Sequence, residues 1–406
     1  MADSSFDVVV VGAGPAGLIT AETLAHQGIN VAVIERDQTP GKDKPCGGFL
    51  TTQGMKEGNI PLELAERTTK GVSIIMPGFP PYHVDYPHSI GIQLTREKLG
   101  RYLSQRAETA GAKLFLQHQV ISCKHDDSRW HMTLQGTVKD LRASLVIGAD
   151  GVTSTVARET GLRTRFHRDE LGITVQAHIA LPEEVISHRF GNRMELYYGR
   201  EFCPYGYLWI FPKSSSVYVG VGSLLSAVTT RLESYLNRFI ETHSMGKAKL
   251  AGGTMQIIER ALVPLTYQRQ SAADGVLLVG DAAGHCSAIT GEGLHYSIAA
   301  GRIAGEVAGN AVKGGHLEYR YLRRYEQRWH HVFGSDLKWG LHLRNYFYRG
   351  MASQSVSSGI SSNRRFLRLA ADLIAGVRPY RDTIVRALPY YLWNRIKTTI
   401  SPKSRN

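Results

Sequence analysis

The chain has 406 residues, of which 43% are hydrophobic and 20% are charged. This composition is typical of a globular protein with a sizeable core, and it excludes a chain that is disordered throughout. No hydrophobic run approaches the roughly 20 residues of a transmembrane helix. The first residues also lack the basic segment and apolar core of a signal peptide. We therefore expect two connected domains in a protein that stays in the reducing cytoplasm.

Positive charge is concentrated at the C-terminal end of the chain. The formal net charge is +13, and residues 363–406 contain ten lysines and arginines but only two aspartates. Large apolar residues are interleaved with them, as in ALPYYLWNRIKTTI (387–400), which favours peripheral association with an anionic membrane surface. The alternative is a basic helix that docks on the body of the protein. We expect no nucleic-acid partner, because the sequence contains no recognition module.

The segment FDVVVVGAGPAGLITAETLAHQGINVAVIERD (6–37) has the pattern of a dinucleotide-binding unit. Val8–Val11 predict a buried parallel strand, and a Gly-x-Gly-x-x-Gly turn follows at once before apolar residues with helical spacing. A second strand ends in Glu35, whose carboxylate can accept hydrogen bonds from a ribose diol. The glycines permit a tight turn, the approach of backbone N–H groups to a pyrophosphate, and close packing of helix on strand. The predicted nucleotide-binding residues are Gly12, Ala13, Gly14, Pro15, Ala16, Gly17, Glu35 and Arg36.

Two later segments carry further glycine and aspartate clusters. LVIGADGVTSTVARETG (145–161) is an apolar strand that leads into Asp150 and Gly151. GVLLVGDAAGHCSAITGEGLHYSIAAG (275–301) is a second such strand that leads into Asp281 and a glycine-rich helix start. An NAD dehydrogenase has no need of the last element. A bound FAD does, because Asp281 can hold its ribityl or pyrophosphate part while N–H groups near Gly293 lie against the flavin ring.

Together the three motifs resemble those of FAD-dependent reductases and hydroxylases with the glutathione-reductase-type fold. The resemblance implies an α/β protein with a FAD-binding Rossmann-like fold, an antiparallel-sheet substrate domain and a helical C-terminal region. We expect the FAD-binding domain at 1–164 and 271–315, the substrate domain at 165–270, and the helical, basic region at 316–406. By the same resemblance the Asp150 motif is associated with both FAD and NADPH. The further cofactor contacts that the resemblance implies are Arg96 at a helix start, Val120 through its backbone, Gly291, Gly293 and Leu294.

Cys46 lies in DKPCGGFLTTQG (43–54), between a proline and two glycines. The other cysteines, Cys123, Cys203 and Cys286, show no C-x-x-C spacing, so the sequence offers no pattern for a zinc or iron–sulfur site. From the residues alone, Cys46 is either a buried packing residue or a reactive thiol.

The segment KPCGG, together with CPYGYLWIFPKSSSVYVGVGS (203–223), resembles the geranylgeranyl reductase family. Within that family the sequence most resembles the branch that acts on geranylgeranyl groups of chlorophyll or of its diphosphate precursor, and the archaeal lipid and menaquinone reductases are looser matches. The segment TGEGLHYSIAAGRIAGE (290–306) is similar as well, although Ala288 stands where many relatives have proline. The residues that match the Tyr-x-Trp-x-Phe-Pro-Lys block of the family are Tyr207, Trp209, Phe211, Pro212 and Lys213.

The resemblance implies a reductase that saturates carbon–carbon double bonds of an isoprenoid chain. Hydride would come from N5 of the reduced flavin and the proton from Cys46, with NADPH or reduced ferredoxin as the electron donor. Gly47 and Gly48 would let the backbone approach the flavin ring. Tyr207, Trp209 and Phe211 would bind the isoprenoid, with core packing as the alternative role of these aromatic residues.

Other functions stay open at this point. An aromatic monooxygenase or halogenase on the same scaffold would use oxygen and would not need Cys46. A quinone-linked flavin oxidoreductase is a further alternative, although the sequence lacks the cysteine cluster of its commonest form. A non-catalytic basic protein is disfavoured by the intact FAD motifs. Of the histidines, His285 is interpreted as an ordinary polar residue, and His295 is a candidate for the wall of the flavin pocket.

Overall fold

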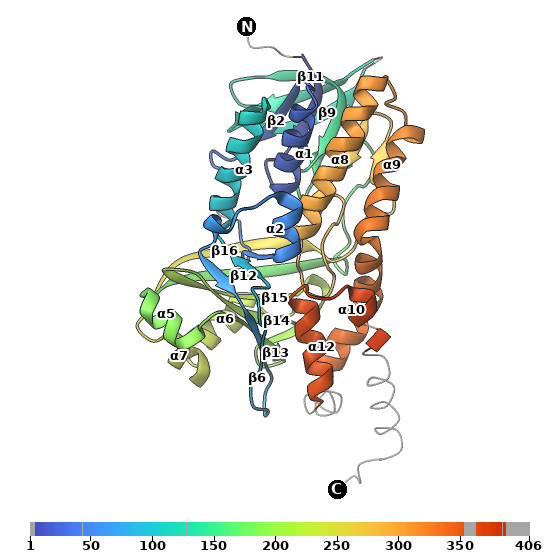
Figure 1. Ribbon diagram of the computed structural model, residues 1–406. Coiled ribbons are helices and arrows are strands. Elements are labelled where there is room, and N and C mark those ends of the chain that lie inside the picture. The colour runs from blue at the N-terminus through green and yellow to red at the C-terminus, as the bar shows by residue number, and fades with distance from the viewer. Residues whose placement is uncertain (1–4, 43, 127, 353–362, 384, 387–406) are drawn as a thin grey trace.

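The computed structural model describes residues 5–42, 44–126, 128–352, 363–383 and 385–386. The apolar and basic segment 387–400 therefore lies outside the described residues. Two large sheets, a small three-stranded sheet and a C-terminal group of helices make up the molecule (Figure 1). The predicted fold class, a FAD-binding α/β fold with a helical C-terminal region, is confirmed. In the described part of the chain, no helix is long and apolar enough to cross a bilayer.

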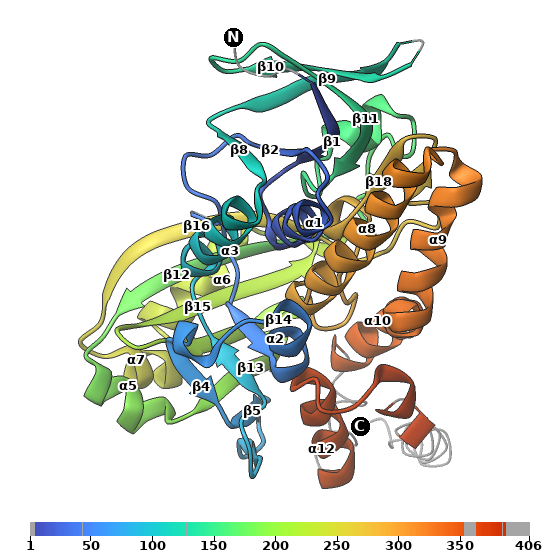
Figure 2. The same ribbon diagram turned by 45° about the horizontal axis from the view of Figure 1, so that its top comes forward.

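The first sheet has eight strands and is built around β1, the strand predicted from the valine run. β1 pairs in parallel with β2 and β11, with Val8 opposite both Val31 and Leu145. Helices α1, α3 and α8 pack on one face of the parallel strands. The β9–β10 ribbon, which joins the same sheet through β11, packs on the other face (Figure 2). The strands are β1 (Ser5–Val11), β2 (Val31–Glu35), β8 (Lys113–Leu116), β9 (Gln119–His125), β10 (Trp130–Gln135), β11 (Asp140–Gly148), β17 (Ala272–Ala273) and β18 (Val276–Leu278). The helices of this region are α1 (Pro15–His26), α3 (Arg96–Ala110), α4 (Thr155–Glu159), η3 (Gly280–Ala282) and α8 (Leu294–Gly314).

The second sheet has seven strands in the order β16-β12-β15-β14-β13-β5-β6. Its neighbours pair antiparallel, except that β5 runs parallel to β13. Helices α5, α6 and α7 bury one face of this sheet, and the other face is turned toward the first sheet. The strands are β5 (Gly71–Ile75), β6 (Tyr82–Asp85), β12 (Leu171–Ala180), β13 (Arg193–Gly199), β14 (Cys203–Pro212), β15 (Ser216–Leu224) and β16 (Thr254–Pro264). The covering helices are α5 (Glu183–Phe190), α6 (Leu232–Glu241) and α7 (Ser244–Leu250), with η2 (Leu225–Ala227) after β15.

Strands β5 and β6 extend the antiparallel sheet although they belong to the segment 1–164, which we expected to form only the FAD-binding domain. Their strand-forming pattern is visible in the sequence, but their pairing with β13 joins residues more than one hundred positions apart. Nearby lie the small sheet and two short helices. These elements are β3 (Phe49–Thr51), α2 (Thr52–Gly58), η1 (Leu62–Leu64), β4 (Arg67–Thr69) and β7 (Gly91–Gln93).

The C-terminal helices α10 and α12 lie beside β13 and β5 of the second sheet (Figure 1). The carboxylate of Asp372, which is 2% exposed, accepts hydrogen bonds from Tyr86 Oη, Arg368 Nε and Arg378 Nε, each at 2.9 Å. These contacts fix α12 against β6 and use two of the basic groups internally. The described part of the basic segment thus docks on the body of the protein. The helices are α9 (Tyr319–Trp329), the π-helical η4 (His330–Gly334), α10 (Ser335–Ala352) and α12 (Arg364–Ile374).

Candidate functional site

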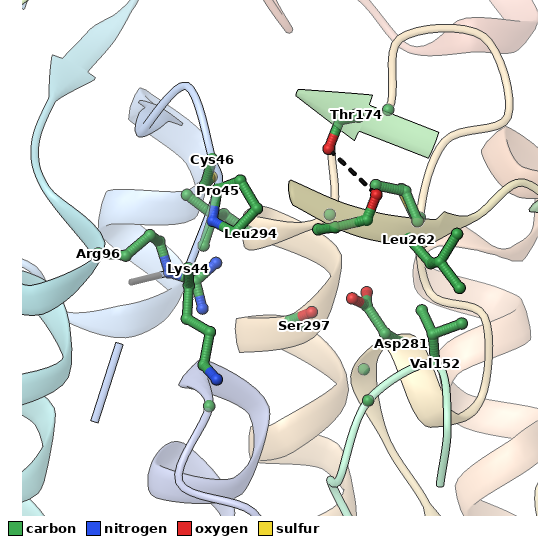
Figure 3. Close-up of a pocket in the computed structure, with 18 of the residues that line it drawn as sticks. Lys44, Pro45, Cys46, Arg96, Val152, Thr174, Leu262, Asp281, Leu294 and Ser297 are labelled. Carbon is green, nitrogen blue, oxygen red and sulfur yellow. Dashed lines mark hydrogen bonds between the residues drawn. The ribbon is translucent and has the colours of Figure 1, made fainter. Parts of the chain in front are cut away.

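A cavity of about 680 Å³ lies between the carboxyl ends of the first sheet and the inner face of the second. All predicted site residues line it except Gly17 and the candidate His295, so three motifs that are far apart in the sequence come together. Figure 3 shows Cys46 and Arg96 on one side of this space, with Asp281 and Leu262 on the opposite side. A cavity of this size, with both polar and apolar walls, is in the range of sites that bind cofactors and small molecules.

The glycine-rich turn has the geometry of a phosphate cradle. Gly12 has a φ of +104°, and a side chain there would overlap the Ala149 carbonyl. Gly17 lies behind the cavity wall, where a side chain would overlap the carbonyl oxygen of Gly12, so it is needed for packing of α1 on β1. At Gly14 a Cβ would meet no protein atom within 4 Å, because this position faces open space at the start of α1. The N-terminus of α1 therefore points its free N–H groups into the cavity.

Glu35 and Asp150 shape the turns on either side of this cradle. Glu35 Oε2 accepts a hydrogen bond from the Ala13 N–H at 2.8 Å, which ties the glycine-rich turn to the end of β2. Asp150 accepts hydrogen bonds from Ser154 Oγ at 2.5 Å and from the Thr155 N–H at 2.7 Å. Burial raises the pKa of Asp150, and these hydrogen bonds act in the opposite direction. Both carboxylates line the cavity, and Val120 lines it from β9.

Arg96 and Asp281 carry polar atoms that the described residues leave unpaired. Arg96 starts α3, and its buried Nε has no hydrogen-bond partner in the structure. Asp281 follows β18 in η3; burial raises the pKa of its carboxyl to about 6, and the charge of Arg96 acts in the opposite direction. A buried donor without an acceptor is costly, as is a desolvated carboxylate. A ligand with phosphate oxygens for Arg96 and hydroxyl groups for Asp281 would satisfy both, and FAD has this combination.

The cysteine loop lies at the junction of the cofactor side and the second sheet. Cys46 is a free thiol and is half-buried, whereas the other cysteines of the chain are buried. Its Sγ accepts a hydrogen bond from the Gly48 N–H at 3.4 Å, and its carbonyl accepts one from Gln176 Nε2 at 3.3 Å. Gly48 has a φ of +74°, and at Gly47 a side chain would overlap the Phe211 ring. The two glycines therefore allow the loop to pack closely against β14. The motif alone does not show this reason for having glycine at both positions.

Alternate residues of β14 form an aromatic wall of the cavity. The ring centroids of Tyr207 and Trp209 are 5.8 Å apart, and those of Trp209 and Phe211 are 6.5 Å apart. Trp209 Nε1 donates a hydrogen bond to Gln176 Oε1 at 3.2 Å, and the Tyr207 hydroxyl donates one to the Thr290 carbonyl. With their polar groups engaged by the protein, the rings present apolar faces to the space next to Cys46.

The loop before α8 completes the site. Gly291, Gly293 and Leu294 line the cavity here, whereas His295 does not. Ala288 is buried in this loop, and Tyr380, after α12, is hydrogen-bonded to Ser287 Oγ at 2.5 Å and to Thr290 Oγ1 at 3.0 Å. The C-terminal region thus fixes the loop that was predicted to face the flavin. His285 is fully buried among Trp329 and other aromatic rings, and burial lowers its pKa to about 3.

Sequence reasoning missed several residues of the site. Ile374 of α12 lines the cavity, but no motif marks it, because its position depends on how the C-terminal helix docks. Gln176 of β12 connects the Cys46 loop to Trp209 through one hydrogen bond to each. The available signal was a polar residue in a strand of alternating apolar residues. Lys213 was recognised as part of a sequence block, but its burial beneath the cysteine loop was not foreseen.

Comparison with known proteins fits this geometry. A family model described as an FAD binding domain matches residues 5–332. A digeranylgeranylglycerophospholipid reductase 2 from Methanothermobacter thermautotrophicus is 33% identical over 400 residues, which cover 93% of this chain and 100% of that protein. This chain belongs to the geranylgeranyl reductase family of FAD-binding proteins.

A second relative and a solved structure also match most of the chain. A chloroplastic geranylgeranyl diphosphate reductase from Oryza sativa subsp. japonica is 31% identical over 368 residues, covering 86% of this chain and 76% of that protein. The two identities are nearly equal, so they do not support the expectation that the lipid reductases match less closely than the chlorophyll and diphosphate branch. The fold matches that of a geranylgeranyl bacteriochlorophyll reductase-like protein from Thermoplasma acidophilum, with a TM-score of 0.82 at 24% identity over 95% of this chain and 99% of that one.

Proposed function

We propose that this protein is an FAD-dependent reductase that saturates carbon–carbon double bonds of a geranylgeranyl or similar isoprenoid chain. One observation carries the proposal: the free thiol of Cys46 lines the same cavity as the phosphate cradle and the aromatic wall of β14. Residues suited to a cofactor, to proton donation and to an apolar chain therefore line one space. Relatives that cover most of the chain bear names of enzymes acting on geranylgeranyl lipids.

The residues of the cradle side are suited to hold FAD. The start of α1 would receive the pyrophosphate at Gly14, and Glu35 would face a ribose. Arg96 and Asp281, whose polar atoms lack partners, would contact phosphate and ribityl groups. The bound flavin supplies the chemistry that side chains lack, the delivery of a hydride to carbon.

Cys46 would supply the proton. Adding hydride to one carbon of an isolated double bond requires a proton at the other, and a positioned acid accelerates such a transfer. The hydrogen bond from the Gly48 N–H orients the sulfur, and its position on the cavity wall leaves it accessible. Tyr207 and Trp209 would bind the isoprenoid chain and keep water from it, since a prenyl chain offers no polar group for recognition.

The electron donor and the membrane are finer parts of the proposal. We infer that NADPH or reduced ferredoxin reduces the flavin, because the double bond of an isoprenoid cannot be its source of electrons. We also infer that the protein reaches its lipid-like substrate as a peripheral membrane protein, supported by the basic and apolar composition of 387–406.

The test is turnover by the dithionite-reduced holoenzyme. Geranylgeranyl diphosphate and a digeranylgeranyl glycerophospholipid are supplied separately, and mass spectrometry measures hydrogen added to each chain. Saturated product from either substrate supports the proposal. Oxygen consumption with a hydroxylated or halogenated aromatic product, and no saturated prenyl product, would instead support the monooxygenase or halogenase alternative.

A further inference from the structure

Lys213 is a fully buried cation beneath the Cys46 loop. It directly follows β14, is 1% exposed, and donates hydrogen bonds to the Gly47 carbonyl at 2.5 Å and to Gln93 Oε1 at 2.7 Å. Neither acceptor carries a charge. The ring of Tyr218 lies 4.8 Å from the ammonium nitrogen. Burying an ammonium among neutral partners costs desolvation free energy. A hydrogen bond that only holds the loop in place could be made by a neutral side chain, so it does not explain why this residue is a lysine.

The ammonium and the Cys46 thiol approach the same glycine. A Cβ on Gly48 would lie 3.1 Å from Lys213 Nζ, and the N–H of Gly48 donates to Cys46 Sγ at 3.4 Å. The two groups interact electrostatically, and the charge of Glu66 also acts on the ammonium. A thiolate formed at Cys46 would therefore be stabilised by the positive charge of the buried Lys213.

We propose that Lys213 promotes proton donation by Cys46: its ammonium fixes the cysteine loop through the Gly47 carbonyl and stabilises the thiolate that remains after the transfer. This inference rests on the proposed function. In the step, the S–H bond breaks and its proton bonds to one carbon of the double bond, using the π electron pair. The other carbon receives the hydride, sulfur keeps the electron pair as thiolate, and a proton from solvent later restores the thiol.

The charge state of Lys213 sets a pH range for this effect. Burial lowers the pKa of Lys213 to about 7, while Cys46 and Glu66 act in the opposite direction. The ammonium therefore predominates below pH 7 and is progressively lost above it, so its stabilisation of the thiolate must decrease as the pH rises. The other titratable or charged groups around the lysine and the thiol are Lys44, Glu66, Arg67, Lys98, Tyr207, Tyr218, His178, Glu259 and Cys286.

The test is the rate at which iodoacetamide alkylates Cys46 in the FAD-loaded protein, followed on the Cys46 peptide by mass spectrometry. Lys213→Gln keeps a hydrogen-bond donor, on a side chain one bond shorter, but has no charge. We expect alkylation in Lys213→Gln to be slower than in wild type at pH 6 and little changed at pH 9, because an opposite charge nearby favours the thiolate. The matched control is Lys98→Met, which removes a half-exposed charge near the same Glu66 and should leave the rate within about twofold.

Turnover gives the second readout. Lys213→Gln should keep its FAD and form saturated product at least about tenfold more slowly at pH 6, with a smaller loss at pH 9. Equal alkylation rates in wild type and Lys213→Gln at pH 6 would overturn the proposal. So would loss of folding or FAD in both Lys213→Gln and Lys213→Met, because that result would assign the lysine a purely structural role. If the alkylation rates differ as expected but wild type forms no saturated product, the proposed function fails while the coupling of lysine and thiol stands.

Discussion

Gly14→Val separates cofactor binding from folding more cleanly than any other glycine substitution in the cradle. Gly14 has φ −71° and ψ 172°, a conformation that valine adopts without strain. Since no protein atom lies within 4 Å of the added Cβ, the side chain enters the cavity where the pyrophosphate would lie. The stability cost to the flavin-free protein should be at most about 1 kcal/mol, the range for losing a favourable N-cap residue.

The cost to FAD binding should be far larger. An isopropyl group at the start of α1 displaces the pyrophosphate from the free N–H groups, and we expect affinity to fall by roughly 100-fold or more, which is about 3 kcal/mol. Gly12→Val is the matched comparison, because its side chain would collide with the Ala149 carbonyl at a φ of +104° and should prevent folding altogether.

The assay is flavin absorbance per mole of purified protein, together with thermal unfolding of wild type and Gly14→Val after both have been stripped of FAD. Stripping is needed because bound cofactor raises the apparent stability of the wild type by mass action. Colourless Gly14→Val protein with near-normal unfolding of the apo form is the expected result. Stoichiometric FAD in Gly14→Val would refute the placement of the pyrophosphate at this turn.

Three further predictions concern the C-terminal region and Lys213. Asp372→Asn should lower the free energy of unfolding by about 2 kcal/mol in a urea titration, less than the loss of a fully buried ion pair, because both arginine partners are half exposed. Asp382→Asn, at an exposed position, should change the free energy of unfolding by less than about 0.5 kcal/mol. Equal effects of the two substitutions would contradict the role of Asp372 in anchoring α12. A chain ending at Arg386 should lose binding to anionic vesicles while its flavin spectrum stays unchanged. Salt should weaken vesicle binding by the full chain in the same direction, because at 0.1 M charges are screened over a Debye length of about 10 Å. Full vesicle binding by the shortened chain would exclude the tail as the membrane contact. Because burial lowers the pKa of Lys213 to about 7, unfolding takes up a proton between pH 7 and 10. The free energy of unfolding of wild type should therefore rise with pH, relative to Lys213→Met, by up to about 1.4 kcal/mol per pH unit. Parallel pH profiles of unfolding free energy in the two proteins would show that the lysine is not desolvated.

The cradle could be predicted from the sequence because its determinants are local. The turn at Gly12 and the start of α1 follow β1 directly, and the motif specifies both the conformation and the close packing. The same holds for the loop after β18 that carries Asp281. Such strand–turn–helix units keep their geometry wherever they occur, so residues recognised from spacing were found around one cavity.

The remaining parts of the site depend on contacts between distant segments. The pairing of β5 with β13 and the docking of α12 that brings Ile374 to the cavity have no local signal. The burial of Lys213 follows from the way the Cys46 loop lies over the end of β14, where lysine in a sequence would ordinarily be expected at the surface. Motif recognition singled out Cys46 as the candidate proton donor, but only the packing of two sheets showed what surrounds it.

The most direct test of the account is the amount of saturated isoprenoid formed per mole of bound FAD by wild type and Cys46→Ser. The serine variant should bind FAD and accept electrons from dithionite as wild type does, because neither step needs the thiol. Its hydroxyl is a far weaker acid than a thiol, whose ordinary pKa is about 8.5, so product per bound FAD should fall by roughly 100-fold or more. Near-equal values in the two proteins would contradict the assignment of Cys46 as the proton donor and return it to a packing role.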